Sequence, residues 1–465
     1  MRSSPRRTAA IVAAKTVAQL SRRLGVGGGT ALPGLVAERL DPGIVPALAS
    51  RLGQGSVIVT GTNGKTTTAR LLRSIVEAGE LIAVANREGS NMMRGVAAAL
   101  ADVSSWDGRV RKRKKMVGVF EVDEATMPKV AAAVCPRAVT FTNLFRDQLD
   151  RYGEVETVAA IWREAVAAFP ENVTLVLNAD DPVVASLRDH ARGPVVLFGI
   201  DDDSLATDEI DHASDARWCT RCGAELQYDA VLYGHIGHWR CSSCGNARPT
   251  PNVRITGTEM TGHGPRISFE GPDFKFGVHL AMGGTYNMYN ALAAAATASV
   301  IGLGTKAIGP GLLNATAAFG RQEMFEIDGR AVHVILAKNP AGLNQVIRTL
   351  PEGELDLAFF LNDDIADGKD ISWIWDVDFE LLAGRVRSLT ASGRRAWDMA
   401  LRLKYAGLAE SPPVEHDSAV ALRNAIRHTP EDGELYVIPT YTAMLQVRAL
   451  LAKWAGRGKF WEGQK

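Results

Sequence analysis

The chain has 465 residues, which is enough for about three domains that each bury a core. Its 52 lysines and arginines balance 52 aspartates and glutamates, so no excess of positive charge favours nucleic acid. No apolar run approaches the roughly 20 residues that span a bilayer, so no membrane-spanning helix is expected. Lys15 interrupts the short apolar stretch near the N-terminus. We expect residues 1–50 to form a helical segment packed on the next domain, in a cytoplasmic protein.

From residue 56 to about 200, short apolar runs alternate with helical patterns such as 155–168. This alternation predicts right-handed βαβ units and a mainly parallel sheet, with ligands bound at the carboxyl ends of the strands. The predicted strands are 56–60, 81–86, 116–121, 138–142, 173–178 and 195–198. They belong to a predicted central domain, residues 51–320.

The pattern changes in the second half of the chain. Antiparallel strands are predicted at 253–255, 266–269 and 276–278, followed by helices at 285–301 and 306–318. Apolar runs at 331–336, 357–361, 385–390 and 435–438 then predict the strands of a second α/β domain, residues 321–465. The basic run at 109–115 is interpreted as a solvated loop, with contact to an anionic membrane surface as the alternative.

One turn predicts a nucleotide site. The apolar run 56–60 leads into a glycine-spaced turn, and helix-forming residues follow it. Between a strand and a helix, backbone N–H groups and the helix dipole face phosphate, a lysine adds charge, and a threonine hydroxyl can ligate Mg²⁺. We expect ATP here rather than a plain surface loop, although Val59 replaces the first glycine of the longer P-loop pattern. The expected ATP-binding residues are Gly61, Thr62, Asn63, Gly64, Lys65 and Thr66.

Polar residues follow other strands of the same predicted sheet. Glu121 ends the strand 116–121, and polar turns follow the strands that end near residues 142 and 178. The carboxyl ends of parallel strands meet at one edge, so Glu121 is expected to share a nucleotide-bound Mg²⁺ with Thr66. In isolation, such a glutamate is more often a solvated cap.

Four of the five cysteines form two C-x-x-C pairs, and a glycine follows each pair. Four thiolates in this spacing predict a closed tetrahedral Zn²⁺ site, with a redox pair or buried free thiols as alternatives. The zinc ribbon would span 217–250 and act as a structural staple. His235 and His238 are interpreted as surface or loop residues, and Cys135 as a small core residue. The predicted ligands are Cys219, Cys222, Cys241 and Cys244.

The turn at 61–66 resembles the ATP loop of the Mur ligases and folylpolyglutamate synthases. In their order along the chain, the motifs at 61–66, 120–125, 142–150 and 177–182 resemble those of a Mur ligase central domain. Asn287, near Asn290, resembles the asparagine that meets the adenine side, and Arg321 resembles an arginine that contacts ATP phosphates. The resemblance implies an α/β fold with a Mur-ligase-like P-loop central domain and ATP contacts from Asn287 and Arg321.

The chain also departs from that family. Gln148 and Ile335 replace a histidine and an aspartate of its motifs, and no lysine occurs at 162–165, where some members carry a carbamylated one. These changes question the usual two-metal chemistry. The ATP turn begins too early for a preceding UDP-binding domain, so recognition of a UDP group is not expected.

The segment 362–378 extends the resemblance. It holds six acids with Trp373 and Trp375, and with 27–30, 86–91, 393–407 and 439–445 it resembles the MurT family. Members of this family are Mur-ligase-like proteins with a four-cysteine insert and their own type of C-terminal domain. The resemblance now covers nearly the whole chain.

Membership would imply a role in peptidoglycan synthesis. MurT-like proteins pair with GatD, a glutamine amidotransferase subunit, and convert the α-carboxylate of the second-position D-glutamate of lipid II into D-isoglutamine. ATP and Mg²⁺ would activate the carboxylate, and ammonia would come from the partner. Cys135, the cysteine outside the two pairs, precedes a proline, so this chain offers no glutaminase nucleophile of its own.

A Cys-His glutaminase needs a carboxylate that orients its histidine, and a neighbouring chain can supply it. Within 362–378 we expect this residue to be Asp367, because Gly368 permits a tight turn; Asp364 and Asp370 are the alternates. A solvated acidic loop is the other interpretation. Two other functions stay open: a stand-alone Mur- or folylpolyglutamate-type ligase, and a scaffold without enzymatic activity.

Overall fold

The computed structural model describes residues 4–24, 31–87, 89–107, 110, 113–146, 155–207, 215–261, 264–315 and 321–456. The chain forms two compact units. The first contains the described residues up to Leu144, those from Val155 to Thr207 and those from Ala216 to Ala315. The second contains those from Arg321 onward, together with Phe145, Arg146 and Asp215.

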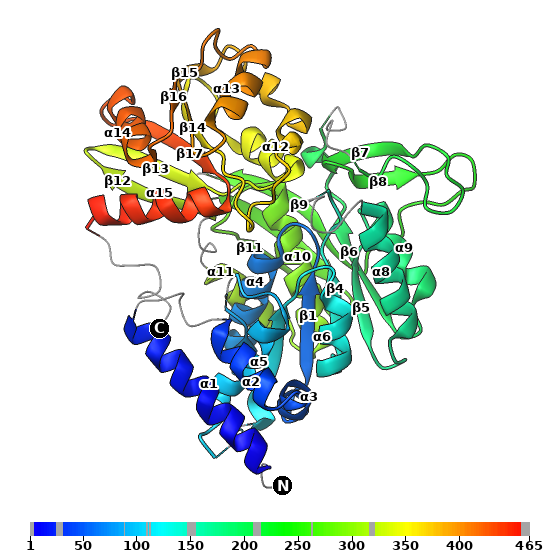
Figure 1. Cartoon of the computed structure of the whole chain (residues 1–465). Helices are drawn as coiled ribbons and strands as arrows, with labels where there is room; N and C mark the ends of the chain where they lie inside the picture. The colour runs from blue at the N-terminus through cyan, green and yellow to red at the C-terminus, as the bar shows by residue number, and fades with distance from the viewer. Residues whose placement is uncertain are drawn as a thin grey trace. The chain divides into compact units, whose positions relative to one another are not determined.

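Three helices begin the first unit (Figure 1): α1 (Pro5–Leu24), α2 (Leu32–Leu40) and α3 (Ile44–Ala49). Helix α1 buries Ala10, Ile11 and Ala14. Arg7 Nε donates to Asp41 Oδ2 at 3.0 Å, which ties α1 to the end of α2. The N-terminal residues thus form helices that pack on the first unit. Among the described residues, no helix is long and apolar enough to cross a bilayer.

A nine-stranded sheet forms the centre of this unit, in the order β11-β10-β9-β6-β5-β4-β1-β3-β2. The pairs from β2 to β9 along this order are parallel, and β9, β10 and β11 are antiparallel. This confirms the predicted mainly parallel sheet. The strands are β1 (Ser56–Thr60), β2 (Ile82–Ala85), β3 (Met116–Glu121), β4 (Ala138–Phe141), β5 (Thr174–Asn178), β6 (Val195–Ile200), β9 (Val253–Thr261), β10 (Gly264–Gly271) and β11 (Phe274–His279).

Helices cover the sheet and make its central strands fully buried. Every residue of β1, β3 and β4 is buried, as continuous apolar runs of parallel strands require. The alanine-rich α10 is buried along most of its length, and Thr297 approaches Thr140 of β4 with their Oγ1 atoms 2.6 Å apart. The helices are α4 (Lys65–Ala78), α5 (Met93–Val103), α6 (Met127–Val134), α8 (Val155–Ala168), α9 (Pro182–Ser186), α10 (Thr285–Val300) and α11 (Thr305–Leu313).

A separate hairpin of β7 (Gln227–Tyr233) and β8 (Ile236–Arg240) projects from the sheet at the right of Figure 1. Its Trp239 packs with Cys219 and Cys241 against Ala185 of α9. The cysteine-rich insert thus has a small core of its own, joined to the central unit.

The second unit is another α/β structure. Its six-stranded sheet has the order β12-β13-β17-β14-β15-β16, parallel except for the β12–β13 hairpin. The strands are β12 (Arg321–Ile327), β13 (Arg330–Ile335), β14 (Leu355–Phe360), β15 (Val386–Ser392), β16 (Val414–Glu415) and β17 (Glu434–Pro439). The helices are α12 (Pro340–Thr349), α13 (Ala396–Tyr405), α14 (Ser418–His428) and α15 (Tyr441–Trp454).

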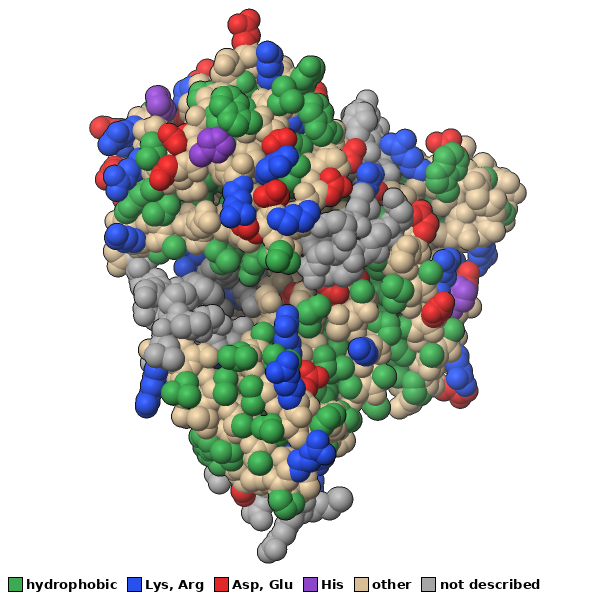
Figure 2. Space-filling model, in the orientation of Figure 1, with side chains coloured by type: hydrophobic (Ala, Val, Ile, Leu, Met, Phe, Trp, Pro, Cys, Tyr) green, Lys and Arg blue, Asp and Glu red, His purple; other side chains and the backbone are tan. Residues whose placement is uncertain are grey.

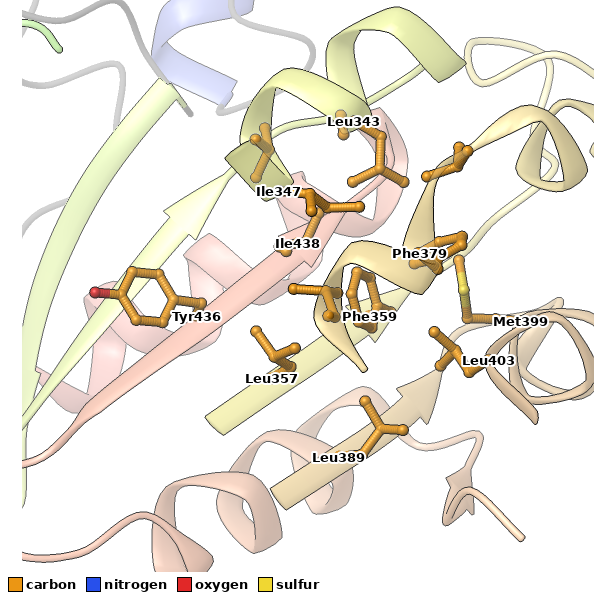
Figure 3. Packing of buried hydrophobic residues seen from close by; sticks show 14 of the residues in the cluster. Leu343, Ile347, Leu357, Phe359, Phe379, Leu389, Met399, Leu403, Tyr436 and Ile438 are labelled. Carbon is orange, nitrogen blue, oxygen red and sulfur yellow. The ribbon is translucent and has the colours of Figure 1, made fainter. Parts of the chain in front are cut away.

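Each face of this sheet has its own hydrophobic core. On one face, Leu357 and Phe359 pack with Leu343 of α12 and Leu403 of α13 (Figure 3). The other face packs against α14 and α15. Two short 3₁₀ helices, η5 (Ser372–Asp376) and η6 (Phe379–Leu382), close the first of these cores, so part of the acidic segment is anchored by buried apolar residues.

Candidate functional site

The glycine turn lies between β1 and α4, as its sequence predicts. Gly61 and Gly64 have φ angles of 134° and 84°, which L-residues with side chains rarely adopt. A Cβ on Gly61 would come within 2.0 Å of Thr142 Oγ1, and one on Gly64 within 1.9 Å of Asn290 Oδ1. Both glycines are therefore required, and α4 starts at Lys65 with its N-terminus facing the turn.

Lys65 is held inside this turn. Its Nζ donates to the carbonyl oxygens of Gly61 and Thr62 and lies 3.0 Å from Glu124 Oε1. The Lys65 and Glu124 side chains are only 8% and 7% exposed. An anionic phosphate that enters the turn would meet a buried ammonium group whose partner carboxylate is already in place.

Thr66 and Glu121 meet at the same edge of the sheet. Thr66 Oγ1 donates to Glu121 Oε1 at 2.9 Å. The amide of Asn86 fixes the Glu121 backbone, because its Nδ2 donates to Glu121 O at 2.9 Å and its Oδ1 accepts from Glu121 N at 3.0 Å. A hydroxyl and a carboxylate oxygen are donors that Mg²⁺ accepts, so this pair fits the predicted metal site.

Two residues that follow β4 hold the outer side of the turn. Asn143 Oδ1 accepts from Asn63 N at 2.8 Å, and Asn143 Nδ2 donates to Asn63 O at 3.1 Å. Thr142 Oγ1 also donates to Asn63 O, at 2.9 Å. The polar turn after residue 142 thus reaches the glycine turn, as expected for neighbouring parallel strands.

Two asparagines of α10 lie beside the start of α4, which follows the glycine turn. Asn290 Oδ1 accepts from Thr68 Oγ1 at 3.3 Å, and Asn290 Nδ2 donates to Asn287 Oδ1 at 3.2 Å. Asn287 therefore lies one side chain away from the turn. Arg321 begins β12 in the second unit, and its side chain lies outside the described residues. Gln148 also lies outside them.

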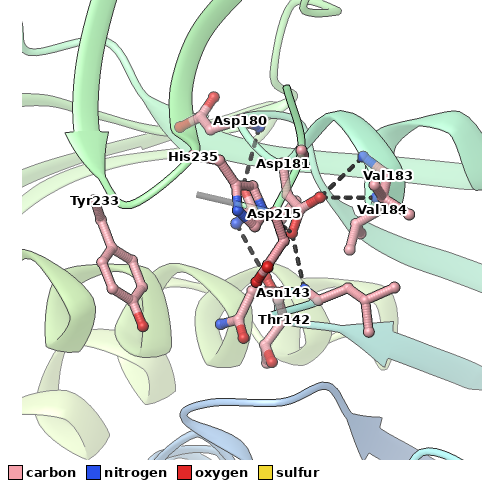
Figure 4. Close-up of polar contacts among 12 residues, drawn as sticks. Thr142, Asn143, Asp180, Asp181, Val183, Val184, Asp215, Tyr233 and His235 are labelled. Atoms are coloured by element: carbon pink, nitrogen blue, oxygen red, sulfur yellow. Dashed lines mark hydrogen bonds and ion pairs between the residues drawn. The ribbon is translucent and has the colours of Figure 1, made fainter. Parts of the chain in front are cut away.

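The turn after β5 carries two fully buried aspartates (Figure 4). Asp180 Oδ1 accepts from Arg248 Nε, and Asp180 Oδ2 accepts from Tyr289 Oη at 2.7 Å. Burial raises the pKa of Asp180 above its usual value, although Arg248 opposes this change. Asp181 instead caps α9, because its Oδ1 accepts from the backbone N–H groups of Val183 and Val184. Both carboxylates are structural supports of the sheet edge.

We expect Arg248→Leu to destabilise the protein by about 3 to 5 kcal/mol, because it leaves the buried carboxylate of Asp180 without its cation. Arg240→Leu is the matched control: its pair with Asp229 is half-exposed, and such pairs contribute about 0 to 1 kcal/mol. Denaturant unfolding of both variants measures the difference. Equal midpoints for the two would contradict this account of Asp180.

The four predicted cysteines converge at the insert. Their sulfur atoms all lie within 4.8 Å of one another, with Cys219 Sγ 3.6 Å from Cys244 Sγ and Cys222 Sγ 3.5 Å from Cys241 Sγ. Four thiolates at about 2.3 Å from a tetrahedral metal would be about 3.8 Å apart, so the set fits a closed metal site. Gly223 and Gly245, each with a φ of 74°, let the backbone after each C-x-x-C pair turn toward the sulfurs.

The backbone of the first C-x-x-C pair also favours the thiolate form of Cys219. Burial disfavours the charged form of Cys219, but N–H groups of Arg221 and Cys222 and the side chain of Asn246 outweigh this and lower its pKa to about 6. A deprotonated sulfur is the form that binds metal. Together with the sulfur–sulfur distances, this supports a metal ligand at Cys219 rather than an inert buried thiol.

Three sequence interpretations need correction. His235 is not a surface residue: its side chain is fully buried, with Nε2 3.5 Å from Asp181 Oδ2. His238 lies in β8, and its Nε2 is 2.7 Å from the carbonyl oxygen of Ile200. Cys135 is exposed rather than a core residue, and it caps the C-terminal end of α6 with a φ of 47°. The sequence pattern does not show that the hairpin turn is covered by the sheet edge.

In the second unit, Asp367 is buried against the start of α15. Its Oδ1 accepts from Thr442 N at 2.8 Å, and its Oδ2 accepts from Thr442 Oγ1. Burial raises the pKa of Asp367, and the nearby charge of Asp364 adds to this, while Thr442 opposes it. Gly368 has a φ of 89°, as the predicted tight turn requires.

The two alternates have different surroundings. Asp364 Oδ2 lies 3.1 Å from Thr442 Oγ1, as a second possible acceptor of the one hydroxyl hydrogen, and its Oδ1 pairs with Arg394 Nη1 at 2.6 Å. Its side chain is 34% exposed. Asp370 instead caps η5 through Ser372 N at 2.8 Å. Asp364 and Asp367 thus form one cluster around Thr442, and Asp370 has a local capping role.

Glu124 and Asn143 are site residues that sequence reasoning did not single out. Glu124 lies three residues after Glu121, and Asn143 begins the polar turn after β4. Both therefore lie in segments that the sequence already places at the nucleotide edge of the sheet. What was missing was the direction of each side chain toward the turn.

Comparison with known proteins agrees with these two units. A model of the Mur ligase middle domain matches residues 59–298, and a model of the MurT ligase C-terminal domain matches residues 336–444. The chain is also similar to the solved structure of a pseudomurein peptide ligase type C from Methanothermus fervidus, with 22% identity and a TM-score of 0.67. That likeness covers 88% of this chain and 80% of the other, and it shows a shared fold.

Two relatives match nearly end to end. One is the lipid II isoglutaminyl synthase (glutamine-hydrolyzing) subunit MurT of Staphylococcus aureus (strain COL), with 34% identity over 94% of this chain and 96% of the relative. The other is the subunit of the same name from Streptococcus pneumoniae (strain ATCC BAA-255 / R6), with 33% identity over 92% of this chain and 93% of the relative. The chain therefore belongs to the MurT family of Mur-ligase-like, ATP-dependent ligases.

Proposed function

We propose that this chain is the synthetase subunit that amidates the α-carboxylate of the second-position D-glutamate in lipid II, giving D-isoglutamine. One observation carries the proposal: Lys65 and Thr66 of the glycine turn lie beside two buried carboxylates, Glu124 and Glu121, at the carboxyl edge of the sheet. These residue types suit a site that binds a nucleoside triphosphate and its Mg²⁺ for transfer of a phosphoryl group to a carboxylate. The names of the two relatives, both lipid II isoglutaminyl synthase subunits, support lipid II as the substrate.

The reaction has two steps in this proposal. A carboxylate oxygen of the substrate attacks the γ-phosphoryl group of ATP, which releases ADP and leaves an acyl phosphate. Ammonia then attacks the acyl carbon, phosphate leaves, and the amide forms. Lys65 and the N-terminus of α4 stabilise negative charge on the phosphates. Mg²⁺ held by Thr66 and Glu121 would neutralise further charge, and Asn287 and Arg321 complete the proposed ATP contacts.

The ammonia would come from a glutaminase subunit of the GatD type. A partner surface on the second unit supports this. Trp397, Leu401 and Tyr405 repeat every four residues along α13, and Trp397 and Tyr405 are 68% and 70% exposed. Ile365, in the acidic segment, is 84% exposed. Figure 2 shows hydrophobic side chains among acidic and basic ones on this unit. Large exposed apolar groups of this kind mark protein interfaces.

We further propose that the acidic segment lends a carboxylate to the partner's catalytic histidine. Asp367 is the first candidate, because Thr442 fixes its orientation through both carboxylate oxygens. Asp364 is the more exposed alternate, and Asp370 is disfavoured by its capping role. Lipid II as substrate would place the complex at the cytoplasmic face of the membrane.

The proposed metal of the four-cysteine site is Zn²⁺. We expect about one zinc per chain after purification in reducing buffer, because four thiolates leave no open position. Cys241→Ser should lose the metal and lower the melting temperature, while Cys135→Ser, outside the cluster, should keep both. Metal analysis by mass spectrometry checks this. A wild-type zinc content far below one per chain would contradict the proposal.

The function is tested with the purified chain, ATP, a lipid II analogue and ammonium. The proposal expects ADP and an amidated product of one mass unit less than the substrate. With glutamine in place of ammonium, product should form only when the glutaminase partner is added. A stand-alone amino-acid ligase would instead need a free amino acid, and a scaffold would hydrolyse no ATP in either mixture.

A further inference from the structure

The four-cysteine insert reaches the glycine turn. Tyr233, the last residue of β7, accepts a hydrogen bond at its Oη from Asn63 Nδ2 at 3.3 Å, across 170 residues of sequence. Asn63 is the residue whose backbone N–H and carbonyl are both held by Asn143. Asn143, which follows a strand of the sheet, and Tyr233 of the insert therefore both form hydrogen bonds with the turn that is proposed to bind ATP.

Further contacts fix the hairpin that carries Tyr233. Gly237 N donates to Asp180 O at 2.9 Å, and Trp239 Nε1 donates to Ala179 O at 3.1 Å. His235, at the tip, is buried beside Asp181 (Figure 4). The hairpin thus docks along the turn that follows β5, so its tip cannot shift without moving a buried part of the sheet edge.

The same hairpin depends on the cysteine cluster. Trp239, which bonds to Ala179, packs directly with Cys219 and Cys241. The hydroxyl oxygen of Tyr228 in β7 also lies 2.9 Å from the carbonyl oxygen of His235 and 3.1 Å from that of Ala216, and either can accept its single hydrogen. A continuous set of contacts therefore joins the metal-site cysteines to the hairpin tip and the tip to Asn63.

We propose that the four-cysteine insert positions the ATP turn, with Tyr233 as the positioning residue that acts through Asn63. This extends the interpretation of the insert as a staple for its own residues: its metal would also set the affinity of the neighbouring nucleotide site. The inference rests on the proposed ATP site at residues 61–66. It gives Tyr233 no contact with substrate, so Tyr233 is not a catalytic residue.

The test is calorimetric titration of the full chain with ATP and magnesium. Tyr233→Phe removes one hydroxyl and should raise Kd roughly three- to tenfold, the usual effect of losing one hydrogen bond. Tyr436→Phe is the matched control, because its hydroxyl bonds Glu434 in the second unit and its loss should leave Kd unchanged. Adding Tyr233→Phe to Asn63→Ala should change Kd no further, because the hydroxyl's partner is already gone.

The metal forms a second arm of the test. Cys241→Ser should raise Kd for ATP in the wild-type background, and by a smaller factor when Tyr233 is already phenylalanine. The double variant Lys65→Ala/Glu124→Gln serves as the benchmark for the site itself, because Lys65→Ala alone leaves the buried Glu124 carboxylate without its cation. If the double variant weakens ATP binding but Tyr233→Phe stays within twofold of wild type, the positioning role is wrong and the ATP site stands. If the double variant leaves Kd unchanged, both proposals fall.

Discussion

Replacing Lys65 with alanine should reduce ATP-dependent synthesis by about a hundredfold or more, the usual cost of removing one group that stabilises transition-state charge. The ammonium group lies in the turn that is proposed to bind ATP, where it donates to the carbonyl oxygens of Gly61 and Thr62. Loss of this charge would leave the transferring phosphoryl group without its nearest cation. Steady-state assays with ammonium as nitrogen source would measure the effect without involving a glutaminase.

The buried partner makes a second variant necessary. Lys65→Ala leaves Glu124 buried without its cation, which destabilises the fold independently of catalysis. The double variant Lys65→Ala/Glu124→Gln removes this stranded charge, so it should regain stability and stay inactive. Lys275→Ala, which breaks a surface pair with Glu270, should change neither property. Near-normal synthesis by the stable double variant would show that the ATP site lies elsewhere.

Asp367→Asn should abolish glutamine-dependent synthesis by the two-subunit complex while ammonium-dependent synthesis continues. An asparagine keeps the shape and can still accept from Thr442, but it cannot support the charge of a histidine in the partner. Changes of this kind in other hydrolases lower turnover by about 10⁴-fold. Ammonia and glutamine assays on the same complex, with glutamate release as a third readout, separate nitrogen supply from amide formation.

Two neighbouring variants identify the residue. Asp364→Asn tests the alternate that shares Thr442, and Asp370→Asn tests an acid of the same segment that caps η5. The proposal expects Asp370→Asn to leave glutamine use intact. Loss confined to Asp364→Asn would transfer the role to that residue. Normal glutamine hydrolysis by all three variants would place the carboxylate within the partner itself.

The sequence was sufficient for the framework of both sheets, because their central strands are apolar on both faces. Val57 to Val59, for example, are all fully buried. It was insufficient for β12 and β16. Met324 of β12 is 48% exposed at the edge of its sheet, and β16 has two residues, so neither gives a continuous apolar run. The sequence feature that could have indicated the β12–β13 hairpin is Asp328-Gly329, which forms the tight turn before β13 with positive φ angles.

The candidate site also has features that the sequence predicts and one contact that it does not. The types and order of residues predicted the glycine turn, the Thr66–Glu121 pair and the cysteine cluster, because each depends on spacing within a short segment or on the ends of adjacent strands. The contact between Tyr233 and Asn63 could not be predicted in this way. It depends on where an inserted hairpin docks, which is decided by packing of Trp239 and His235 rather than by any local pattern.

The long-range bonds around the glycine turn have a consequence for how the protein is made. Thr68 bonds to a residue 222 positions later, and Asn63 bonds to one 170 positions later. At roughly 5 to 20 residues per second, a ribosome needs roughly 10 to 45 s to supply the later of these partners. The turn emerges early and acquires its final shape only after α10 has been synthesised. Nascent chains that stop before residue 290 should therefore carry the complete Gly61–Thr66 sequence without the contact between Asn290 and Thr68.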